Sequence, residues 1–406
     1  MSGADSKPKN PGRVFALALG LISLITPLAV HLFMPVIPAV KAALQISDAQ
    51  AQLTFSISLF GMALATLFYG TLSDRYGRRP VLLSGLALFL FGSVVSAAAT
   101  TPLALVLGRL IQAIGAGCAL TLVRAIARDA YSSQYLVQAI AYLTMFGALG
   151  PMVAPIIGGV LIDTLGWRSV FGFALIAGGA IALIAHLSMY ETHPPAHRTA
   201  GGESVARSYA ALLSRLRFNA FVLHSGLVTG AFMVMATASA SLMTELLHRP
   251  ATEFGLYFLL FPMGFFAGNL ISVRIGDRVA GETMILLGSV LALVSVVAQA
   301  LTMWNGLVLP LAFFLPGTFV TMAQGIAMPY AQAGAMTEIP RYAGTAAGIG
   351  VFMQNFWAAV FSQLYGLLAD GTPQPMIGIE LLCGVLILGV GTIPYILQRR
   401  SAARVA

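Results

Sequence analysis

The sequence has too few charged residues to form the surface of a water-soluble protein. Of its 406 residues only 9% are charged and 58% are hydrophobic, whereas a soluble domain carries about 25% charged residues. The two cysteines lie inside apolar runs without CxxC spacing, and the six histidines form no HExxH motif. The apolar runs also hold no nucleophile–base pair and no Gly-rich phosphate loop. These absences argue against an enzyme, a disulfide framework and a metal or cofactor site.

The chain consists mostly of apolar runs whose length suits a membrane span, which takes about 20 residues. The pattern predicts an all-α membrane protein with about twelve transmembrane helices, surrounded by the lipid bilayer. The runs extend over residues 14–38, 50–73, 81–99, 103–127, 136–161 and 168–190, and then over 219–244, 251–273, 283–304, 306–330, 342–368 and 375–397.

One long polar stretch, residues 191–217, divides the chain near its midpoint. Leu212, Leu213 and Leu216 near its end predict a short amphipathic helix on the inner membrane surface. The expected organisation is an N-terminal six-helix bundle over 1–190, a cytoplasmic linker over 191–217 and a C-terminal six-helix bundle over 218–406. Two such repeats are typical of secondary transporters.

Lysine and arginine are distributed unevenly between the two sides that this topology creates. With the N-terminus inside, 18 of the 22 fall in cytoplasmic segments, three fall outside and Arg109 lies within a run. Because basic residues concentrate on the cytoplasmic side of membrane proteins, both termini are expected in the cytoplasm. The net charge of +8 therefore reflects topology, and basic residues scattered in this way form no face that binds nucleic acid.

The segment from Gly70 to Pro80, GTLSDRYGRRP, places one acid and three arginines in a short turn between the second and third runs. A basic loop that only sets topology would need the arginines, but not Gly70, Asp74 and Gly77 at this spacing. The segment closely resembles the signature loop of the major facilitator superfamily, Gly-x-x-x-Asp-Arg-x-Gly-Arg-Arg/Lys. The resemblance implies the major facilitator fold, with twelve helices in two bundles.

In that superfamily the loop locks the state that is open to the outside. Carried over, Asp74 is expected to face the N-terminus of the eleventh helix near Ala343, where the helix dipole favours an anion. Arg78 is expected to pair with Asp129 at the inner end of the fourth run. Such a latch serves alternating access. The latch residues implied by the resemblance are Gly70, Asp74, Arg75, Gly77, Arg78, Arg79 and Asp129.

Arg109 lies well inside the fourth apolar run, in LGRLIQAIGAG. An arginine at mid-membrane costs about 2.5–3.5 kcal/mol on insertion scales, so it is expected to face the bundle interior and to have a partner. Gln112, one turn further, shares its face. The alternative is an arginine that extends to the outer interface. The run resembles the superfamily's Arg-x-x-x-x-Gly pattern, whose arginine is implicated in proton coupling.

The fifth run reads GALGPMVAPIIGG and is rich in glycine and proline. Small residues at this density let helices approach closely, and prolines kink and stiffen a helix. The run resembles the antiporter motif Gly-Pro-x-x-Gly-Pro-x-x-Gly-Gly, which marks exporters in the superfamily, with Ala154 in place of one glycine. The matching residues are Gly147, Gly150, Pro151, Pro155, Gly158 and Gly159.

Three further stretches narrow the family, at Arg128–Tyr131, Glu191–Pro195 and Ala343–Ala346. They resemble the Bcr/CflA group of drug-efflux transporters, and the likeness is stronger in the first half of the chain. Members of that group exchange drugs such as bicyclomycin and phenicols for protons. The resemblance implies a secondary active multidrug efflux transporter of the bacterial inner membrane, with small amphipathic drug-like substrates and protons as its partners.

One departure from that group concerns the first run, where the group has an Asp-x-Tyr-Leu-Pro motif. This chain reads HLFMP from His31 to Pro35, and Glu380 is placed near the end of the last run, so no mid-span acid is expected. Proton coupling is therefore assigned to His31 together with Arg109, because histidine titrates near neutral pH. The alternatives are a neutral, hydrogen-bonded or interfacial histidine, drug uniport, or Asp129 as the proton carrier.

Six polar or aromatic residues are candidates for the wall of a central cavity, although each by itself more often packs or faces lipid. They are Phe33, Gln112, Tyr142, Phe232, Asn355 and Trp357. The scarcity of charge in the runs favours a neutral or anionic, partly apolar substrate. The sequence thus predicts a monomeric drug/proton antiporter without a cofactor. A transporter of an amino acid or sugar and a non-transporting membrane sensor are the alternatives, but a sensor usually needs a soluble domain that the linker is too short to hold.

Overall fold

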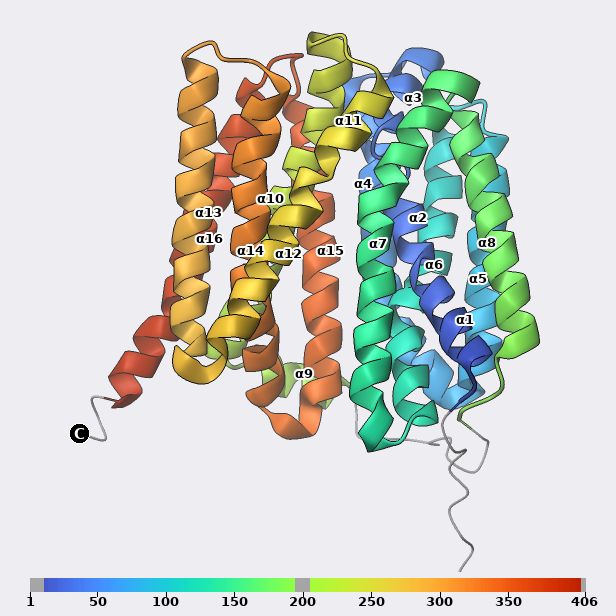
Figure 1. Cartoon of the computed structure of the whole chain (residues 1–406), viewed down its shortest axis with the longest axis vertical. Helices are drawn as coiled ribbons and strands as arrows, with labels where there is room; N and C mark the ends of the chain where they lie inside the picture. The colour runs from blue at the N-terminus through green and yellow to red at the C-terminus, as the bar shows by residue number, and fades with distance from the viewer. Residues whose placement is uncertain (1–10, 194–204, 403–406) are drawn as a thin grey trace, which may run out of the picture.

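The computed structural model describes residues 11–193 and 205–402, and within these ranges the chain forms helices and turns without a β-strand. Most helices of α1–α8 pack mainly against one another, as do most of α10–α16, although α11 packs mainly against α7 and α15 also packs against α4. The two groups are called here the N-terminal and C-terminal bundles (Figure 1). The N-terminal bundle consists of α1 (Arg13–Ser23), α2 (Ile25–Val30), α3 (Val36–Leu44), α4 (Asp48–Tyr76), α5 (Arg78–Ala97), α6 (Pro102–Ala130), α7 (Ser133–Leu165) and α8 (Arg168–Ser188).

The second half of the chain begins with the short helix α9, at the end of the predicted linker. The elements are α9 (Val205–Leu213), α10 (Leu216–Ser241), the π-helical turn η2 (Leu242–Leu246), α11 (Ala251–Phe258), α12 (Leu260–Ile275), α13 (Gly281–Trp304), α14 (Pro310–Thr337), α15 (Ala343–Leu368) and α16 (Gln374–Ala402), with 3₁₀ turns at Gly276–Arg278 and Pro340–Tyr342. Leu212 is buried and Leu213 is exposed, so α9 has an apolar face. Residues 194–204 of the predicted linker lie outside the described residues.

Eleven helical segments of the described residues are long and apolar enough to cross a membrane. The predicted run 342–368 is not among them, because Gln354, Asn355 and Gln363 lower its hydropathy, yet it forms the 26-residue helix α15. This helix packs against α4 of the other bundle and against α10 and α14 of its own. The structure therefore shows an all-α membrane protein.

The first apolar run does not form the single helix that the sequence predicted. It is divided into α1, α2 and α3, with turns from His31 to Pro35 between the last two. Pro35 and Pro38 have no N–H to donate to the carbonyl groups four residues earlier, so the helical hydrogen bonds are interrupted there. The break places His31 at the end of α2 rather than inside a continuous helix.

Helices in both bundles approach each other closely where one of them carries a glycine. A Cβ on Gly92 or Gly115 of the α5–α6 pair would lie within 2.4 Å of backbone atoms of the partner helix, and the same holds for Gly264 and Gly268 between α12 and α14. Small residues at the interface are how membrane helices maximise van der Waals contact, since lipid supplies no hydrophobic driving force between them. These contacts hold each bundle together.

The two ends of the molecule differ in what they carry (Figure 1). Helix α1 begins and α16 ends at the lower end of the view, where α9 also lies. The upper end carries α3, η2 and the start of α11. The arginine-rich segment that joins α4 to α5 belongs to the lower end, which is therefore called here the basic end.

Candidate functional site

The charged loop between α4 and α5 is held in a defined shape. Gly77 has φ of +101°, a conformation that residues with a Cβ rarely adopt, and it ends α4 directly before α5 begins. The side chain of Arg78 is only 3% exposed and lies between two acids. Its Nε donates to Asp129 Oδ2 at 2.9 Å and its Nη1 lies 2.6 Å from Asp74 Oδ1. The expected pair of Arg78 and Asp129 is thus present, and it joins the loop to the end of α6.

Glu191, just after α8, also contacts this loop, although the sequence pattern did not assign it to the latch. Its carboxylate accepts hydrogen bonds from the backbone N–H groups of Arg78 at 2.9 Å and Arg79 at 3.3 Å. These are N–H groups of the first turn of α5, which otherwise have no partner within the helix. Arg79 in turn donates to the carbonyl of His186 at 2.9 Å. The sequence feature that could have indicated this contact is an acid just beyond the sixth run, on the same predicted side of the membrane as the loop.

Asp74 does not contact α15 in this structure, contrary to the expected latch. Its carboxylate is 48% exposed and pairs with Arg78 of its own bundle. A Cβ on Gly344, in the first turn of α15, would have no atom within 4 Å. Arg75 stacks on Tyr76 at 5.4 Å, and Gly70 likewise has open surroundings. The loop is therefore folded but not engaged with the C-terminal bundle.

Away from the basic end, α4 and α15 are in close contact. Ser56 Oγ donates to Gln363 Oε1 at 2.6 Å, and Gln363 Nε2 donates to the carbonyl of Ala49 at 3.1 Å. A Cβ on Gly366 would lie 2.4 Å from Gln52. Lower on the two helices, the rings of Phe60 and Phe356 are 6.5 Å apart. The two bundles are therefore joined along the upper parts of these helices.

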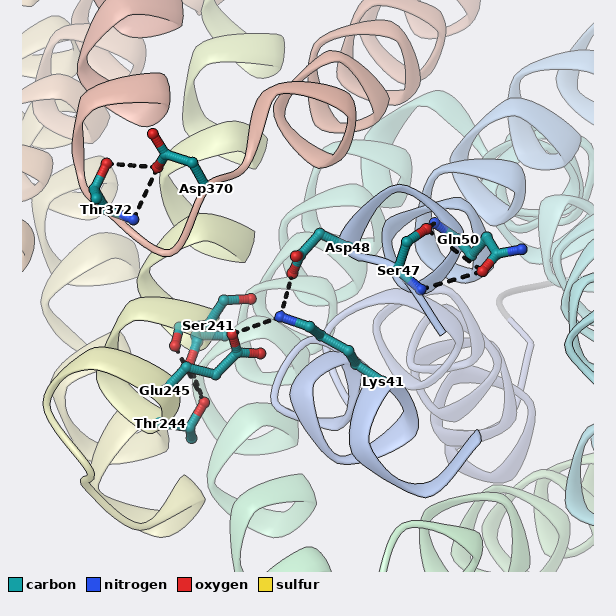
Figure 2. A network of polar contacts seen from close by, with 10 residues as sticks. Lys41, Ser47, Asp48, Gln50, Ser241, Thr244, Glu245, Asp370 and Thr372 are labelled. Atoms are coloured by element: carbon teal, nitrogen blue, oxygen red, sulfur yellow. Dashed lines mark hydrogen bonds and ion pairs between the residues drawn. The ribbon is translucent and has the colours of Figure 1, made fainter. Parts of the chain in front are cut away.

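An ion cluster joins the bundles at the upper end (Figure 2). Lys41 Nζ of α3 lies 2.6 Å from Asp48 Oδ1 at the start of α4 and 2.7 Å from Glu245 Oε2 of η2, so one lysine joins acids of both bundles. Burial favours a lower pKa for Lys41, but the hydrogen bonds and charges of Asp48 and Glu245 outweigh it and raise the pKa. Lys41 therefore remains a cation while the two bundles are in contact.

A second contact at the upper end caps a helix of one bundle with a carboxylate of the other. Asp163 of α7 accepts hydrogen bonds from the N–H groups of Ala251 at 3.2 Å and Thr252 at 2.8 Å, and from the Thr252 hydroxyl at 2.6 Å. These groups form the first turn of α11, where backbone N–H groups lack partners and the helix dipole is positive. The contacts of Lys41 and Asp163 are together called here the upper clasp.

Arg109 is buried in the N-terminal bundle, with 1% of its surface exposed, which excludes the alternative of an arginine at the outer interface. Its Nε donates to the carbonyl of Thr54 at 3.2 Å and its Nη1 to Gln112 Oε1 at 2.6 Å. The guanidinium also lies 4.0 Å from the centre of the Phe33 ring, a cation–π contact worth about 2 kcal/mol when desolvated. Gln112 continues the chain of contacts by donating to Ser93 Oγ at 2.8 Å.

His31 lies at the junction of the bundles rather than beside Arg109. Its ring meets that of Phe258, on α11 of the C-terminal bundle, edge to face at 6.3 Å. Its Nδ1 atom is buried and has no partner among the described residues. Of the two residues assigned to proton coupling, Arg109 is buried and His31 is half-buried, and no contact between their side chains is found among the described residues.

The glycine- and proline-rich segment of α7 contacts both bundles. A Cβ on Gly150 would lie 2.3 Å from Pro27, and one on Gly158 would lie 2.5 Å from the carbonyl of Leu32. On the other side, Gly159 lies against Ala251 of α11. Gly147 alone among the motif glycines has open surroundings, and Pro151 and Pro155 lie within α7. The motif therefore allows α7 to touch both the broken first run and α11.

The six candidate cavity residues do not share one cavity. Phe33 and Gln112 are buried by their contacts with Arg109, and Phe232 packs on Phe258 and Phe261. Asn355 donates to the carbonyl of Val351 on its own helix. Tyr142 lines a cavity between α1 and α7, and Trp357 lines another between α10 and α15.

Glu380 was placed near a helix end by the sequence, but the structure buries it completely. Its side chain is 1% exposed, and neither carboxylate oxygen has a partner among the described residues. It lies on α16, which packs against α10 and α13 inside the C-terminal bundle. Composition did not reveal this, because a residue close to the end of an apolar run can still lie in the interior when the neighbouring helices extend past it.

Comparison with known proteins identifies the family. The sequence model of the Major Facilitator Superfamily matches residues 19–362. The chain belongs to this superfamily. Two of its similar relatives are a bicyclomycin resistance protein homolog of Haemophilus influenzae, 24% identical over 90% of this chain and 92% of the relative, and multidrug resistance protein D of Escherichia coli, 27% identical over 92% of this chain and 93% of the relative.

Solved structures of the superfamily have the same fold. A D-xylose–proton symporter superposes with a TM-score of 0.74 over 92% of this chain and 96% of its own, at 14% identity. A POT family transporter in complex with 5-aminolevulinic acid gives a TM-score of 0.74 over 95% of this chain and 96% of its own, at 13% identity. As a member of the Major Facilitator Superfamily, the protein is a membrane transporter and not an enzyme.

Proposed function

We propose that this transporter exports small, amphipathic, drug-like molecules from the bacterial cytoplasm across the inner membrane in exchange for protons. The observation that carries the proposal is the segment Gly147–Gly159 of α7, which resembles the antiporter motif and lies where α7 meets both α2 and α11. The names of the relatives from Haemophilus influenzae and Escherichia coli support a drug as the substrate.

The topology that fits this function has twelve membrane crossings and both termini in the cytoplasm. Helix α15 is counted as the twelfth crossing because it is as long as its neighbours and packs among them. The N-terminal and C-terminal bundles, joined through the linker, are proposed to move as two units, and the second begins with α10 at Leu216, two residues earlier than the sequence indicated. The arginines of the basic end then face the cytoplasm.

Alternating access follows from the uneven distribution of contacts between the bundles. The ion pairs and hydrogen bonds between them in the described residues lie on the upper side, so the conformation is closed to the outside. Residues 52, 56 and 60 of α4 lie opposite residues 366, 363 and 356 of α15. The same antiparallel register, continued to the basic end, brings Asp74 to the level of Ala343. The latch that the sequence predicts is thus proposed to form in the opposite conformation. That conformation is open to the outside and arises when the upper clasp breaks.

Export is tested by drug accumulation in a bacterial strain that lacks its own efflux pumps. Cells that express the chain are expected to accumulate several-fold less of a substrate drug than cells with an empty vector, because an antiporter of this type moves drug outward. Collapse of the proton gradient with an uncoupler is expected to restore accumulation. The Gly159→Leu variant is a matched control, because a larger side chain cannot fit against Ala251.

An increase of accumulation on expression would contradict export and favour an importer. The alternative of a metabolite transporter predicts that no drug tested is affected while an amino acid or sugar changes its distribution. A membrane sensor predicts that neither class of compound moves in liposomes that contain the purified chain.

The upper clasp gives a prediction about the balance between the two states. Asp163→Ala is expected to reduce the population closed at the upper end about threefold to tenfold, because the loss of a side chain that caps a helix N-terminus typically costs about 1 kcal/mol. Spin labels at Leu103 and Leu307, which are both exposed at this end, report the separation of the bundles.

Asp370→Ala is the matched control for this variant (Figure 2). Asp370 is an acid of the same end that accepts hydrogen bonds from Thr372 of its own loop, which lower the pKa of Asp370, and within the described residues it forms no hydrogen bond or ion pair with the other bundle. The Asp370→Ala variant should leave the distance between the two spin labels unchanged. Identical distance distributions in Asp163→Ala and the wild type would rule out a role for the Asp163 contact.

A further inference from the structure

A cavity of about 320 Å³ lies near the basic end of the N-terminal bundle. One face of α7 supplies Tyr135, Gln138 and Tyr142, and the end of α6 supplies Tyr131. The opposite wall is the first part of α1, where Ala16 faces the cavity. The volume is at the lower limit of the about 300–1,000 Å³ that is usual for small-molecule sites.

The lining of this cavity is aromatic and polar but carries no charge. In the part of the chain that the structure describes, the hydroxyl groups of Tyr131, Tyr135 and Tyr142 and the carboxamide of Gln138 form no hydrogen bond within the protein, and Tyr135 and Gln138 are exposed. Burial, together with nearby Tyr190 and Tyr142, raises the pKa of Tyr131, so its hydroxyl stays protonated and able to donate. Tyrosine offers a large apolar ring and a polar tip, a combination that suits molecules with both properties.

Other aromatic residues hold the lining in place. Tyr142 packs against Phe146 at 4.8 Å, and a Cβ on Gly20 of α1 would lie 3.0 Å from the Phe146 ring, so α1 and α7 meet directly above the cavity. At the side, Phe15 and Tyr190 pack at 4.8 Å. The Tyr142 ring is thus held by a neighbouring ring and offers a surface on which a flat molecule can stack.

The C-terminal bundle has a smaller counterpart of this cavity. It has about 190 Å³ and lies between α10 and α15, lined by Asn219 and Trp357 among others. Ala16 and Asn219 each stand three residues after the first residue of their helices, Arg13 and Leu216, which begin the two bundles. The two cavities therefore occupy corresponding positions in the two bundles. Of the two, the N-terminal cavity has the larger volume and is lined by three tyrosines.

We propose that the cavity between α1, α6 and α7 binds neutral, planar aromatic molecules with hydrogen-bonding edges, and that exported substrates of this class first bind there. Calling these molecules substrates rests on the proposed export function; the binding itself does not. The site lies at the end where the bundles are not clasped, so it is reached from the side that the basic residues face. The absence of charge in its lining selects against cations and anions.

Binding is tested on the purified full chain in lipid nanodiscs with two neutral probes, tritiated chloramphenicol and N-phenyl-1-naphthylamine, and with ethidium as a cation. The wild type is expected to bind a neutral probe saturably and ethidium at least about tenfold more weakly. Tyr135→Phe and Tyr142→Phe keep the rings and remove one hydroxyl each, so each is expected to weaken binding about twofold to tenfold. Ala139→Phe fills the cavity and is expected to abolish saturable binding.

Two variants serve as controls for folding and for the location of the binding site. Tyr257→Phe removes a hydroxyl in the C-terminal bundle, where that ring stacks on Phe314, and Asn219→Ala alters the smaller cavity. Both should bind like the wild type. Wild-type affinity in Ala139→Phe and both tyrosine variants would overturn the proposal, as would a wild type that binds neither neutral probe saturably. A phospholipid that co-purifies with the wild type and is lost in Ala139→Phe would overturn it too, because the cavity would then be a lipid site.

Failure of this site and failure of the proposed export give different results. A chain that lowers drug accumulation in cells but binds no probe in this cavity refutes the site and leaves export standing. A chain that binds the probes as described but does not change accumulation refutes export and leaves the site standing.

Discussion

Asp74→Asn is expected to leave the protein inserted and abundant but to slow transport severely, by up to about thirtyfold. In the state described, Asp74 pairs with Arg78, whose main partner Asp129 remains in the variant, so the fold of the loop should survive. In the opposite state Asp74 is proposed to cap α15, and an uncharged amide loses the attraction to the helix dipole, worth about 0.3–2 kcal/mol. Drug flux into or out of liposomes that contain the purified variant measures the effect.

Asp74→Glu is the matched variant, because it keeps the charge and should restore part of the flux. Spin labels at the basic end add a second reading: Asp74→Asn should increase the population open at that end. Full transport by Asp74→Asn, with unchanged label distances, would exclude the latch and leave Asp74 as a partner of Arg78 only.

His31→Ala is expected to abolish proton movement that is driven by drug, while His31→Asp keeps it with a shifted pH profile. The ring of His31 lies at the junction of the bundles, against Phe258, and its Nδ1 atom has no hydrogen-bond partner in the described residues, so no contact fixes that nitrogen as a donor or an acceptor. Histidine changes its charge between pH 5 and 8. A pH-sensitive dye inside liposomes measures the flux from about pH 5.5 to 8.5, the range in which a histidine and its replacements differ.

His224→Gln is the control for this experiment. His224 is buried, and its Nε2 atom is hydrogen-bonded to Ser289 Oγ at 2.9 Å within the C-terminal bundle, away from the junction. Its replacement should leave the proton-to-drug ratio unchanged. If His31→Ala retains the wild-type ratio instead, the proton is carried elsewhere, and the acids to test next are Asp129 at the end of α6 and Glu380, whose carboxylate has no partner among the described residues.

The sequence predicted those features that depend on local pattern. Apolar runs of membrane length became helices, and the spacing of Asp74, Gly77 and Arg78 predicted a structured loop. The break of the first run was not predicted, although its cause, two prolines after His31, is local. Pro35 and Pro38 lie at the end of the run and therefore indicated where it stops, rather than a break after which the helix resumes.

Features that depend on distant parts of the chain could not be predicted in the same way. Lys41 and Glu245 are 204 residues apart, and no local pattern connects them. Asp163 and Glu380 raise the same difficulty: one caps a helix of the other bundle and the other is buried among three helices. The contacts of Asp74 also depend on the conformation of the transporter, and one sequence adopts at least two conformations during transport.

The contact of Asp163 with the first turn of α11 is built from one side chain on one bundle and, at Ala251, from main-chain atoms on the other. Every amino acid except proline supplies the same N–H group. This hydrogen bond therefore does not specify which amino acid stands at 251, whereas it requires the acid at 163. In such a pairing the two partners need not co-vary, so a search for correlated substitutions between the bundles would overlook one of the contacts that holds them together.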